Sequence, residues 1–373
     1  PMGVAPGPRP RACCGDDPRA LPLMDERWPD LDEWRLALAP AGVRFDHALA
    51  QGWECIGPLM HRGPFASLGD RTLGLVPVRQ PVQRVGFSRN QRKLLARNRR
   101  RFQTEVTARV DLTLAEPLYA ANQHRLLGDR FDSLGVLAGR YTARGGPRLT
   151  QVNVWDGATL AAVSFMLLGE VTGYSLIGLF HPDYAAHSLG THTMLEEVAF
   201  LRGQGGELYY PGHVMVGSDA LHYKLRLQGL EALDWRRGWR PLAQVLDRGH
   251  PVQAMWQRLA RVEAAFRAEG FEAARVLYPL FSLGAIVQTA QPLVRVPELV
   301  DLGPLADGGR LAVVARLPQG ADQLLRMVQA PHEPWHDELA ETLAKYGQPW
   351  AAQPLGPPCE HPDQLVAQVR GWA

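Results

Sequence analysis

The sequence of 373 residues has few cysteines, no long apolar run and almost no net charge. Its 4 cysteines include no C-x-x-C pair, so we expect neither a disulfide framework nor a bound metal. No stretch approaches the roughly 20 apolar residues that a membrane-spanning helix needs, and no signal peptide opens the chain. These absences favour a cytoplasmic protein with no membrane contact, and a monomer is the starting assumption.

The clearest local feature is a basic segment that contains no acidic residue. Eight cations and no aspartate or glutamate stand between Arg84 and Arg101, whereas the whole chain has a formal net charge of only +2. Ser88 is placed to cap a helix of about 13 residues that carries most of these cations. A helix built for solubility alone mixes charge signs, whereas an unbroken positive surface suits a phosphate backbone.

This basic helix has no aromatic residues interleaved with its cations. That pattern disfavours base stacking on single strands and favours a folded, phosphate-rich partner such as tRNA. A solvated helix face without a ligand is the alternative. On the apolar side, Asn98 is expected to tie the helix to a neighbouring loop. The residues expected to bind tRNA are Arg79, Arg84, Arg89, Arg92, Lys93, Arg97 and Arg100.

The stretch from Tyr174 to Lys224 holds the second informative pattern. It predicts a strand over 174–180 that Pro182 ends, a helix that begins near Ser188, a second strand and a second helix. A strand that runs into a helix N-terminus gathers phosphate or carboxylate groups. We therefore expect the donor substrate to bind at Ser188, Leu189 and Gly190.

The same spacing predicts how the helix after Ser188 is oriented. Ser188 is expected to be its N-cap, and the apolar stripe of the helix is expected to pack on the sheet. Glu196 and Glu197 are then expected to face water.

This order of elements resembles the core of the GNAT acyltransferases, in which Asp219 to Tyr223 would fill the place of the last helix. The usual acetyl-CoA loop reads Arg/Gln-x-x-Gly-x-Gly/Ala. Here Ala185 and Ser188 replace the first two of these residues and only Gly190 is kept. The resemblance therefore implies a phosphate-bearing donor other than acetyl-CoA.

Six motifs in order resemble the arginyl/leucyl-tRNA–protein transferase family across about residues 46–240. The resemblance implies transfer of an aminoacyl group from tRNA to the N-terminal amine of a protein, with aminoacyl-tRNA as co-substrate and no cofactor. The family's cysteine cluster is missing from 65–74, and its Arg-His-rich helix is replaced around 121–127. A peptide or small molecule is thus also open as acceptor. The motifs are Asp46–Trp53, Val76–Val82, Phe87–Asn98, Ser188–Thr191, Tyr209–Gly212 and Tyr223–Lys224.

Aminolysis of an ester is downhill, so the protein has to supply position, a deprotonated amine and stabilisation of the ester oxygen. Backbone N–H groups near Tyr210 and Gly212 are candidates for the last role. Tyr223 stands where GNAT enzymes often place a general acid, with a structural core tyrosine as the alternative.

Three further residues near Tyr223 complete the expected site. His213 and Asp219 are candidates for taking the amine proton, with His213 ranked first. Lys224 is expected to hold a tRNA phosphate or to lie over the sheet.

The expected fold class is α+β, with a GNAT-like core of a mixed twisted sheet flanked by helices. We expect four parts: a flexible tail at 1–27, an N-terminal lobe with the basic helix at 28–102, the core at 103–245 and a C-terminal α/β appendage at 246–373. The sequence of the appendage contains no candidate catalytic residue. Three roles stay open for it: extending the sheet, covering the acceptor cleft or mediating association. Two other functions stay open: an acetyl-CoA-dependent N-acetyltransferase, and a non-catalytic RNA-binding protein on a GNAT core.

One motif is rejected. His332 to His336 satisfy the H-E-x-x-H pattern, but zinc chemistry needs both histidines on one face of a continuous helix. Pro334 is tolerated only in a first helical turn, so we expect the helix to begin there and to leave His332 outside it.

Overall fold

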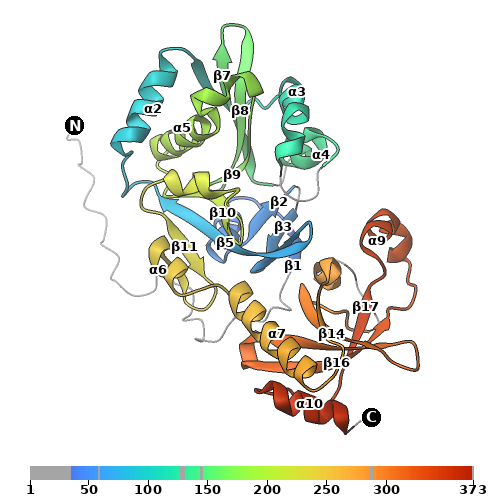
Figure 1. Ribbon diagram of the computed structural model, residues 1–373. Helices are drawn as coiled ribbons and strands as arrows, with labels where there is room; N and C mark the ends of the chain where they lie inside the picture. The colour runs from blue at the N-terminus through green and yellow to red at the C-terminus, as the bar shows by residue number, and fades with distance from the viewer. Residues whose placement is uncertain are drawn as a thin grey trace, which may run out of the picture.

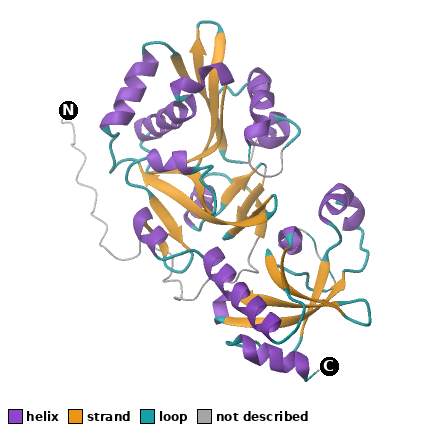
Figure 2. Cartoon of the chain, viewed as in Figure 1, coloured by secondary structure: helices purple, strands orange, loops and turns teal. Residues whose placement is uncertain are grey.

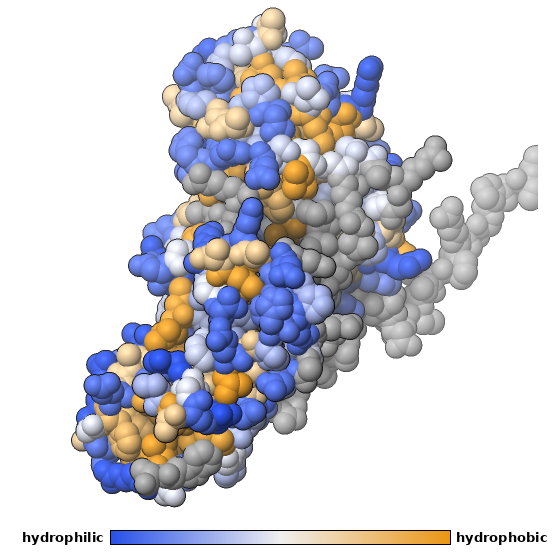
Figure 3. Space-filling model, turned by 90° about the vertical axis from the view of Figure 1, so that its right-hand side faces the viewer, coloured by the Kyte–Doolittle hydropathy of each residue, from blue (hydrophilic) through white to orange (hydrophobic). Residues whose placement is uncertain are grey.

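The computed structural model describes residues 35–371 apart from 58, 127–130, 143–145, 286, 288 and 290. The tail expected at 1–27 lies outside these residues. Strands run through the middle of the molecule and helices cover them, in an elongated shape that two views at right angles share (Figures 1, 2 and 3). The α+β class expected from the sequence is confirmed. Within the described part, no helix has the length and apolar character needed to cross a membrane.

A nine-stranded sheet organises the larger part of the molecule. Its order is β12-β11-β5-β10-β9-β8-β7-β6, with β4 paired to β5. Because β5 lies inside this order, the domain boundary expected after residue 102 falls within one sheet. The strands are β4 (Phe65–Leu68), β5 (Arg71–Pro81), β6 (Gln103–Thr107), β7 (Arg148–Asp156), β8 (Thr159–Leu168), β9 (Thr172–Phe180), β10 (Leu208–Val216), β11 (Glu231–Asp234) and β12 (Gly238–Pro241).

The strands β9 and β10 separate in the middle of this sheet. They pair in parallel only where Leu208–Tyr210 faces Thr172–Tyr174. Beyond that point β10 pairs with β5 alone, after a register shift between Tyr209 and Gly212. Pro211 has no N–H to donate, and Gly212 has a φ of 89° that favours glycine. The gap between the two strands positions the functional site.

Helices cover both faces of β7–β9 (Figure 1). On one face α5 packs on the sheet and α2 packs on α5; on the other lie α3 and α4. A small sheet, in the order β1-β3-β2, lies beside them. The elements are α1 (Val43–Ala50), α2 (Arg89–Arg99), α3 (Leu112–Asn122), η2 (Gln123–Arg125), α4 (Leu134–Ala138), η3 (Gly139–Thr142), α5 (Leu189–Gly203), β1 (Arg35–Leu38), β2 (Glu54–Ile56) and β3 (Leu59–Arg62).

Two expectations for the helix α5 are wrong. Ser188 occupies the N-cap position with a left-handed φ of 54°, and its side chain caps nothing. Glu196 and Glu197 are buried instead of facing water. Glu196 is covered by α2, whose Arg99 binds it, whereas Glu197 faces the large sheet and accepts from the Tyr209 hydroxyl of β10. The helix expected after β10 is also only a 3-10 turn, η5 (His222–Arg226), and a 3-10 turn, η4 (Pro182–His187), precedes α5.

The C-terminal part forms a five-stranded antiparallel sheet in the order β13-β14-β15-β16-β17. It is firmly attached, because Phe65, Leu75 and Met215 of the large sheet share one hydrophobic core with Val252 and Met255 of α7. The elements are α6 (Leu242–Asp247), α7 (Pro251–Ala268), β13 (Ala274–Leu277), η6 (Pro279–Ala285), β14 (Glu298–Pro304), β15 (Arg310–Arg316), η7 (Leu317–Gln319), β16 (Ala321–Gln329), α8 (Trp335–Glu338), α9 (Ala340–Tyr346), β17 (Trp350–Pro354) and α10 (Pro362–Arg370).

Candidate functional site

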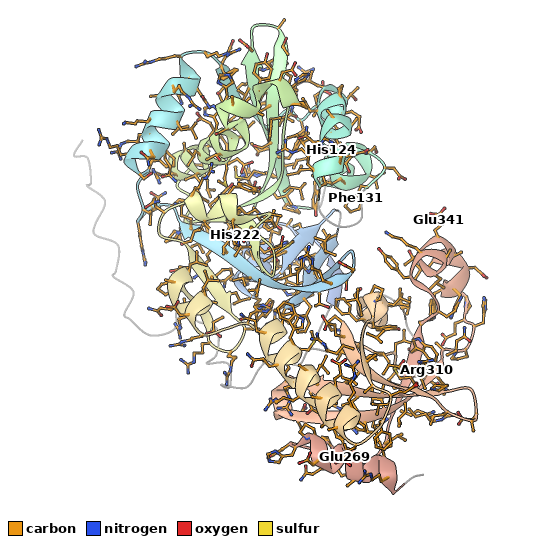
Figure 4. The ribbon with its side chains drawn as sticks, in the orientation of Figure 1. His124, Phe131, His222, Glu269, Arg310 and Glu341 are labelled. Carbon is orange, nitrogen blue, oxygen red and sulfur yellow. The ribbon has the colours of Figure 1, made fainter. Side chains whose placement is uncertain are left out.

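A cavity of about 830 Å³, here called the central cavity, opens where β9 and β10 separate. Its walls come from the small sheet, the large sheet, the start of α5, the turn η5 and the C-terminal part. Phe131 lines one side, and Figure 4 shows α9, which carries Glu341 and the lining residue Tyr346, across from it. The lining residues used below are His61, Leu68, Leu75, Arg125, Ser188, Gly190, Thr191, His213, Met215, Leu221, Tyr223, Lys224, Phe281, Ser282 and Tyr346.

Four ionisable groups lie together at the wall of this cavity and are called the Glu54 cluster: Glu54, His61, His213 and Lys224. His213 Nδ1 lies 3.2 Å from Glu54 Oε1. The Lys224 ammonium donates to the His213 carbonyl oxygen over 3.1 Å. Glu54, His61 and Lys224 are buried, whereas the His213 side chain keeps 22% of its surface exposed. His61, His213 and Lys224 therefore line the cavity, with His213 the most exposed of them, and Glu54 lies behind the lining.

Burial and mutual charge shift the pKa values within the Glu54 cluster. Burial acts to raise the pKa of Glu54, but His213, His61 and Lys224 together bring it below its ordinary value. Burial lowers the pKa of Lys224 to about 8, although Glu54 opposes the shift, and lowers that of His61 to about 4. An ionised Glu54 accepts from His213 Nδ1–H, which makes Nε2 the basic nitrogen of a neutral His213.

Tyr223 lines the same cavity and is 42% exposed, so it is not the core tyrosine considered as the alternative. Desolvation, reinforced by the carboxyl group of Glu197 and opposed by Arg125, raises the pKa of Tyr223. Its hydroxyl therefore stays protonated at neutral pH. A protonated phenol in a cavity can donate a proton to a leaving oxygen.

Glu197 lies beneath Tyr223 with no exposed surface. Its Oε2 accepts from the Tyr209 hydroxyl over 2.6 Å, and its Oε1 has no partner among the described residues. Burial raises the pKa of Glu197 to about 7, against the lowering effect of the hydrogen bond from Tyr209. The Glu197 carboxyl group therefore changes its protonation state near neutral pH.

The structure places the expected donor-binding residues at the start of α5 with unequal access. Ser188 and Gly190 line the central cavity. Leu189 is fully buried in a core with Phe102 and Ala162, so only its backbone remains a candidate.

The expected oxyanion residues also differ in access. A Cβ on Gly212 would come within 3.1 Å of Lys224 Nζ, so this glycine allows the close approach of the lysine. The ring of Tyr210 is buried and packs edge-on against Trp239 at 5.6 Å, away from the cavity lining.

Asp219 does not join His213 and Tyr223. It lies with His222 on a second cavity of about 590 Å³, and its carboxylate is 3.0 Å from His222 Nδ1. Figure 4 shows His222 at the junction of the large sheet and η5. Neighbours in sequence thus face different cavities, because the turn η5 points Tyr223 and His222 in different directions.

The basic helix α2 has the start and the tie that its sequence predicts. Ser88 and Gln91 form a reciprocal capping box with distances of 3.2 and 2.7 Å. The Asn98 amide donates to the His187 carbonyl oxygen over 2.9 Å, which links α2 to the turn before α5. Ser88 as N-cap and Asn98 as a tie are therefore confirmed. The cations Arg84, Arg89, Arg92, Lys93, Arg97, Arg99, Arg100 and Arg101 are exposed.

Some cations of this region have partners inside the protein. Arg99 binds both oxygens of Glu196 over 2.8 and 2.7 Å, and Arg101 pairs with Asp156 over 2.8 Å. Arg79 lies apart in β5, where it pairs with Glu231 over 2.7 Å and stacks on Trp239. The exposed surface offered to a polyanion therefore centres on α2.

Glu54, His61 and Glu197 were missed by reasoning from the sequence. Glu54 and His61 stand in short strands outside the stretch that carries the other candidates. The only local signal is that Glu54 stands among apolar residues between Gly52 and Gly57, and that His61 follows Leu59 and Met60. The rejected motif behaves as expected: α8 begins at Trp335, and His332 lies before it. Among the described residues, no group of three or more His, Cys, Asp or Glu side chains is arranged so that it could hold a metal ion.

Similarity to a known family covers β7 to β11 of the large sheet. The model of the arginine-tRNA-protein transferase C terminus matches residues 119–234. An aspartate/glutamate leucyltransferase of Stenotrophomonas maltophilia (strain K279a) is 29% identical over 241 residues, which cover 59% of this chain and 90% of that protein. That of Xanthomonas campestris pv. campestris (strain B100) is 33% identical over 183 residues, covering 45% and 69%.

A solved structure, the C-terminal domain of a lysylphosphatidylglycerol synthetase from Agrobacterium fabrum, covers 52% of this chain and 58% of that chain. Its sequence identity is 14% and its TM-score 0.30. A similarity at this level supports no statement about the fold.

Proposed function

This chain belongs to the aminoacyl-tRNA–protein transferase family, and we propose that it transfers an aminoacyl group from tRNA to the terminal amine of a peptide or protein at the central cavity. The observation that carries the proposal is the meeting of His213, Lys224 and Tyr223 in one cavity near the basic helix α2. The names of the relatives make leucyl-tRNA the first donor to test. They make peptides with N-terminal Asp or Glu the first acceptors.

The first chemical requirement is a neutral amine. An α-amino group has a pKa of about 7.7–8.0, so part of it is already deprotonated at neutral pH. We assign His213 Nε2 to take the proton that the amine loses as it attacks the ester carbonyl carbon, because Glu54 fixes the other ring nitrogen as a donor. Glu54 thus orients the base, as a third residue does in catalytic triads.

The second requirement is stabilisation of the oxygen that becomes negative. Lys224, with a pKa of about 8, is mostly protonated at neutral pH. Its ammonium group has three N–H bonds, of which one is directed to the His213 carbonyl oxygen. We assign another of them to the oxyanion, where a buried cation acts more strongly than in water.

The third requirement is departure of the ribose. When the carbonyl–oxygen bond breaks, Tyr223 gives its proton to the ribose oxygen, and the new amide keeps the acyl group. No covalent enzyme intermediate is needed, because the amine attacks the ester directly. The proton taken by His213 later restores Tyr223 through solvent.

We also propose that the large sheet is a GNAT-like core, a view supported by the separation of β9 and β10 after Tyr210. The exposed cations of α2 are assigned to the tRNA phosphates. A reaction that consumes aminoacyl-tRNA takes place where tRNA is charged, and we therefore propose the cytoplasm as its location.

A transfer assay tests this function. The protein is offered radiolabelled leucyl-tRNA with peptides that begin with Asp, Glu or Ala, and acetyl-CoA replaces the tRNA in a parallel reaction. The expected result is label in the peptides from leucyl-tRNA and no acetylation. Absence of label with a complete pool of aminoacyl-tRNAs, or acetylation at a comparable rate, overturns the proposal.

A further inference from the structure

Part of the central cavity is built by residues beyond the family match. The match to the family model ends at residue 234. Phe281 and Ser282 from η6 and Tyr346 from α9 nevertheless line the cavity. The C-terminal part therefore contributes to the site and is more than an attachment to it.

The central cavity has two chemically different ends. The polar end is lined by Arg125 of η2 and by Ser188 and Thr191 at the start of α5. The apolar end lies between β4, β5, β10 and the C-terminal part, and its lining residues Leu68, Leu75, Met215, Leu221, Phe281 and Tyr346 belong to one hydrophobic core.

The basic helix α2 lies beside the polar end. Asn98 and Arg97 of α2 both donate to the His187 carbonyl oxygen, one residue before Ser188. A tRNA held by α2 thus has the shortest way to the reacting groups through the polar end. That leaves the acceptor the apolar end, which Met215 lines two residues beyond His213 in β10.

We propose that the apolar end is an acceptor subsite that binds the side chain of a peptide's second residue. The C-terminal part then sets a preference for peptides in which this side chain is apolar. The inference rests on the proposed function. An apolar side chain in this subsite loses contact with water against Phe281 and Leu75, whereas a glycine leaves the subsite unfilled. Phe281 and Tyr346 of this wall lie outside the family model, which ends at residue 234.

The test uses a residue that can fill the subsite without removing a core contact. Ser282 is half-buried on the cavity wall, and Ser282→Trp places an indole into the apolar end. Ala344→Trp is the matched control, because Ala344 is exposed on α9 and does not line the cavity. The acceptors are Asp-Leu and Asp-Gly peptides and aspartate amide, which has no second residue.

In the wild type, kcat/KM for the Leu peptide is expected to exceed that for the Gly peptide about tenfold, the range seen for apolar side chains in enzyme pockets. In Ser282→Trp the Leu peptide loses at least about tenfold, whereas aspartate amide stays within about twofold of the wild type. Ala344→Trp is expected to match the wild type with every acceptor.

Equal rates with the Leu and Gly peptides in the wild type overturn the inference and leave the proposed function standing. The same holds if Ser282→Trp slows aspartate amide as much as the Leu peptide. If the wild type transfers to none of the three acceptors and to no other peptide, the proposed function fails, and the subsite fails with it.

Discussion

The basic helix α2 and the Glu54 cluster are built on opposite principles. In α2 eleven consecutive residues carry the cations on the outside, and the capping box that starts the helix lies within four residues. The Glu54 cluster draws on β2, β3, β10 and η5, and three of its four members are buried. An exposed cation in water is worth little alone, so α2 acts through number. A buried charge is strongly coupled to its neighbours, so each member of the cluster matters.

The largest effect on activity is expected from a substitution in the Glu54 cluster. Lys224→Met keeps the length of the side chain and removes its charge, and kcat is expected to fall about 10³-fold because a buried oxyanion donor is lost. Binding of leucyl-tRNA is expected to stay within about twofold. Single-turnover transfer and filter binding measure the two quantities. An equal loss of tRNA affinity would place Lys224 with the tRNA contacts and not with the chemistry.

The next effect concerns stability. The folded pKa of Glu197 is about 7, above its ordinary value of 4.5, so its contribution to stability is complete below pH 4.5 and is lost as the pH rises through 7. The loss amounts to about 3 kcal/mol. Glu197→Gln does not titrate, so this variant is expected to gain that amount relative to the wild type between pH 4.5 and 7.

Urea unfolding at both pH values measures this gain. The comparison has to be made against the wild type, because His61, whose folded pKa is about 4, makes the wild type more stable as the pH rises over part of the same window. A difference between variant and wild type that does not change with pH would contradict the raised pKa of Glu197.

A third substitution separates the two sides of η5. Tyr223→Phe is expected to lower kcat about 10²-fold, since general acid catalysis contributes at least this much, and to leave KM nearly unchanged. His222→Gln is the matched control, because His222 lines the second cavity. Steady-state kinetics with the Asp-Leu peptide decide the point. Equal effects of the two substitutions would make the tyrosine a structural residue.

The smallest effect is expected on α2. Arg89→Ala with Arg92→Ala removes two exposed cations, and tRNA affinity at low salt is expected to fall about tenfold, with the slope of log K against log salt reduced by about 1.4 to 1.8. The control is Arg261→Ala with Arg275→Ala, two exposed arginines of the C-terminal part. Should both double variants lose the same affinity, α2 has no special part in binding.

Local patterns predicted the elements well where a residue and its partner are close in sequence. Ser88 is the N-cap of α2 because its partner Gln91 is three residues away. The strand before Pro182 and the helix after Ser188 are also present. The same reasoning was wrong for Glu196, because helical spacing does not reveal that α2 covers a second side of α5. It was also wrong for Glu197, which faces the sheet and bonds Tyr209 there.

The candidate site was predicted only in part. His213, Tyr223 and Lys224 do line one cavity, but Asp219 faces another and the ring of Tyr210 is buried elsewhere. The direction of a side chain in a 3-10 turn or beside a bulge depends on how the chain bends there. Spacing alone does not determine that bend.

By itself the sequence determined the position, the charge and the start of α2, together with the motifs that relate the chain to its family, because each of these depends on residues close to one another. Only the tertiary structure decided which carboxylates are buried, that Glu54 meets His213 and Lys224, and that Phe281 and Tyr346 close the cavity. These contacts join residues more than a hundred positions apart in most cases, and they form because β5 lies between β10 and β11 and the C-terminal core packs onto that sheet.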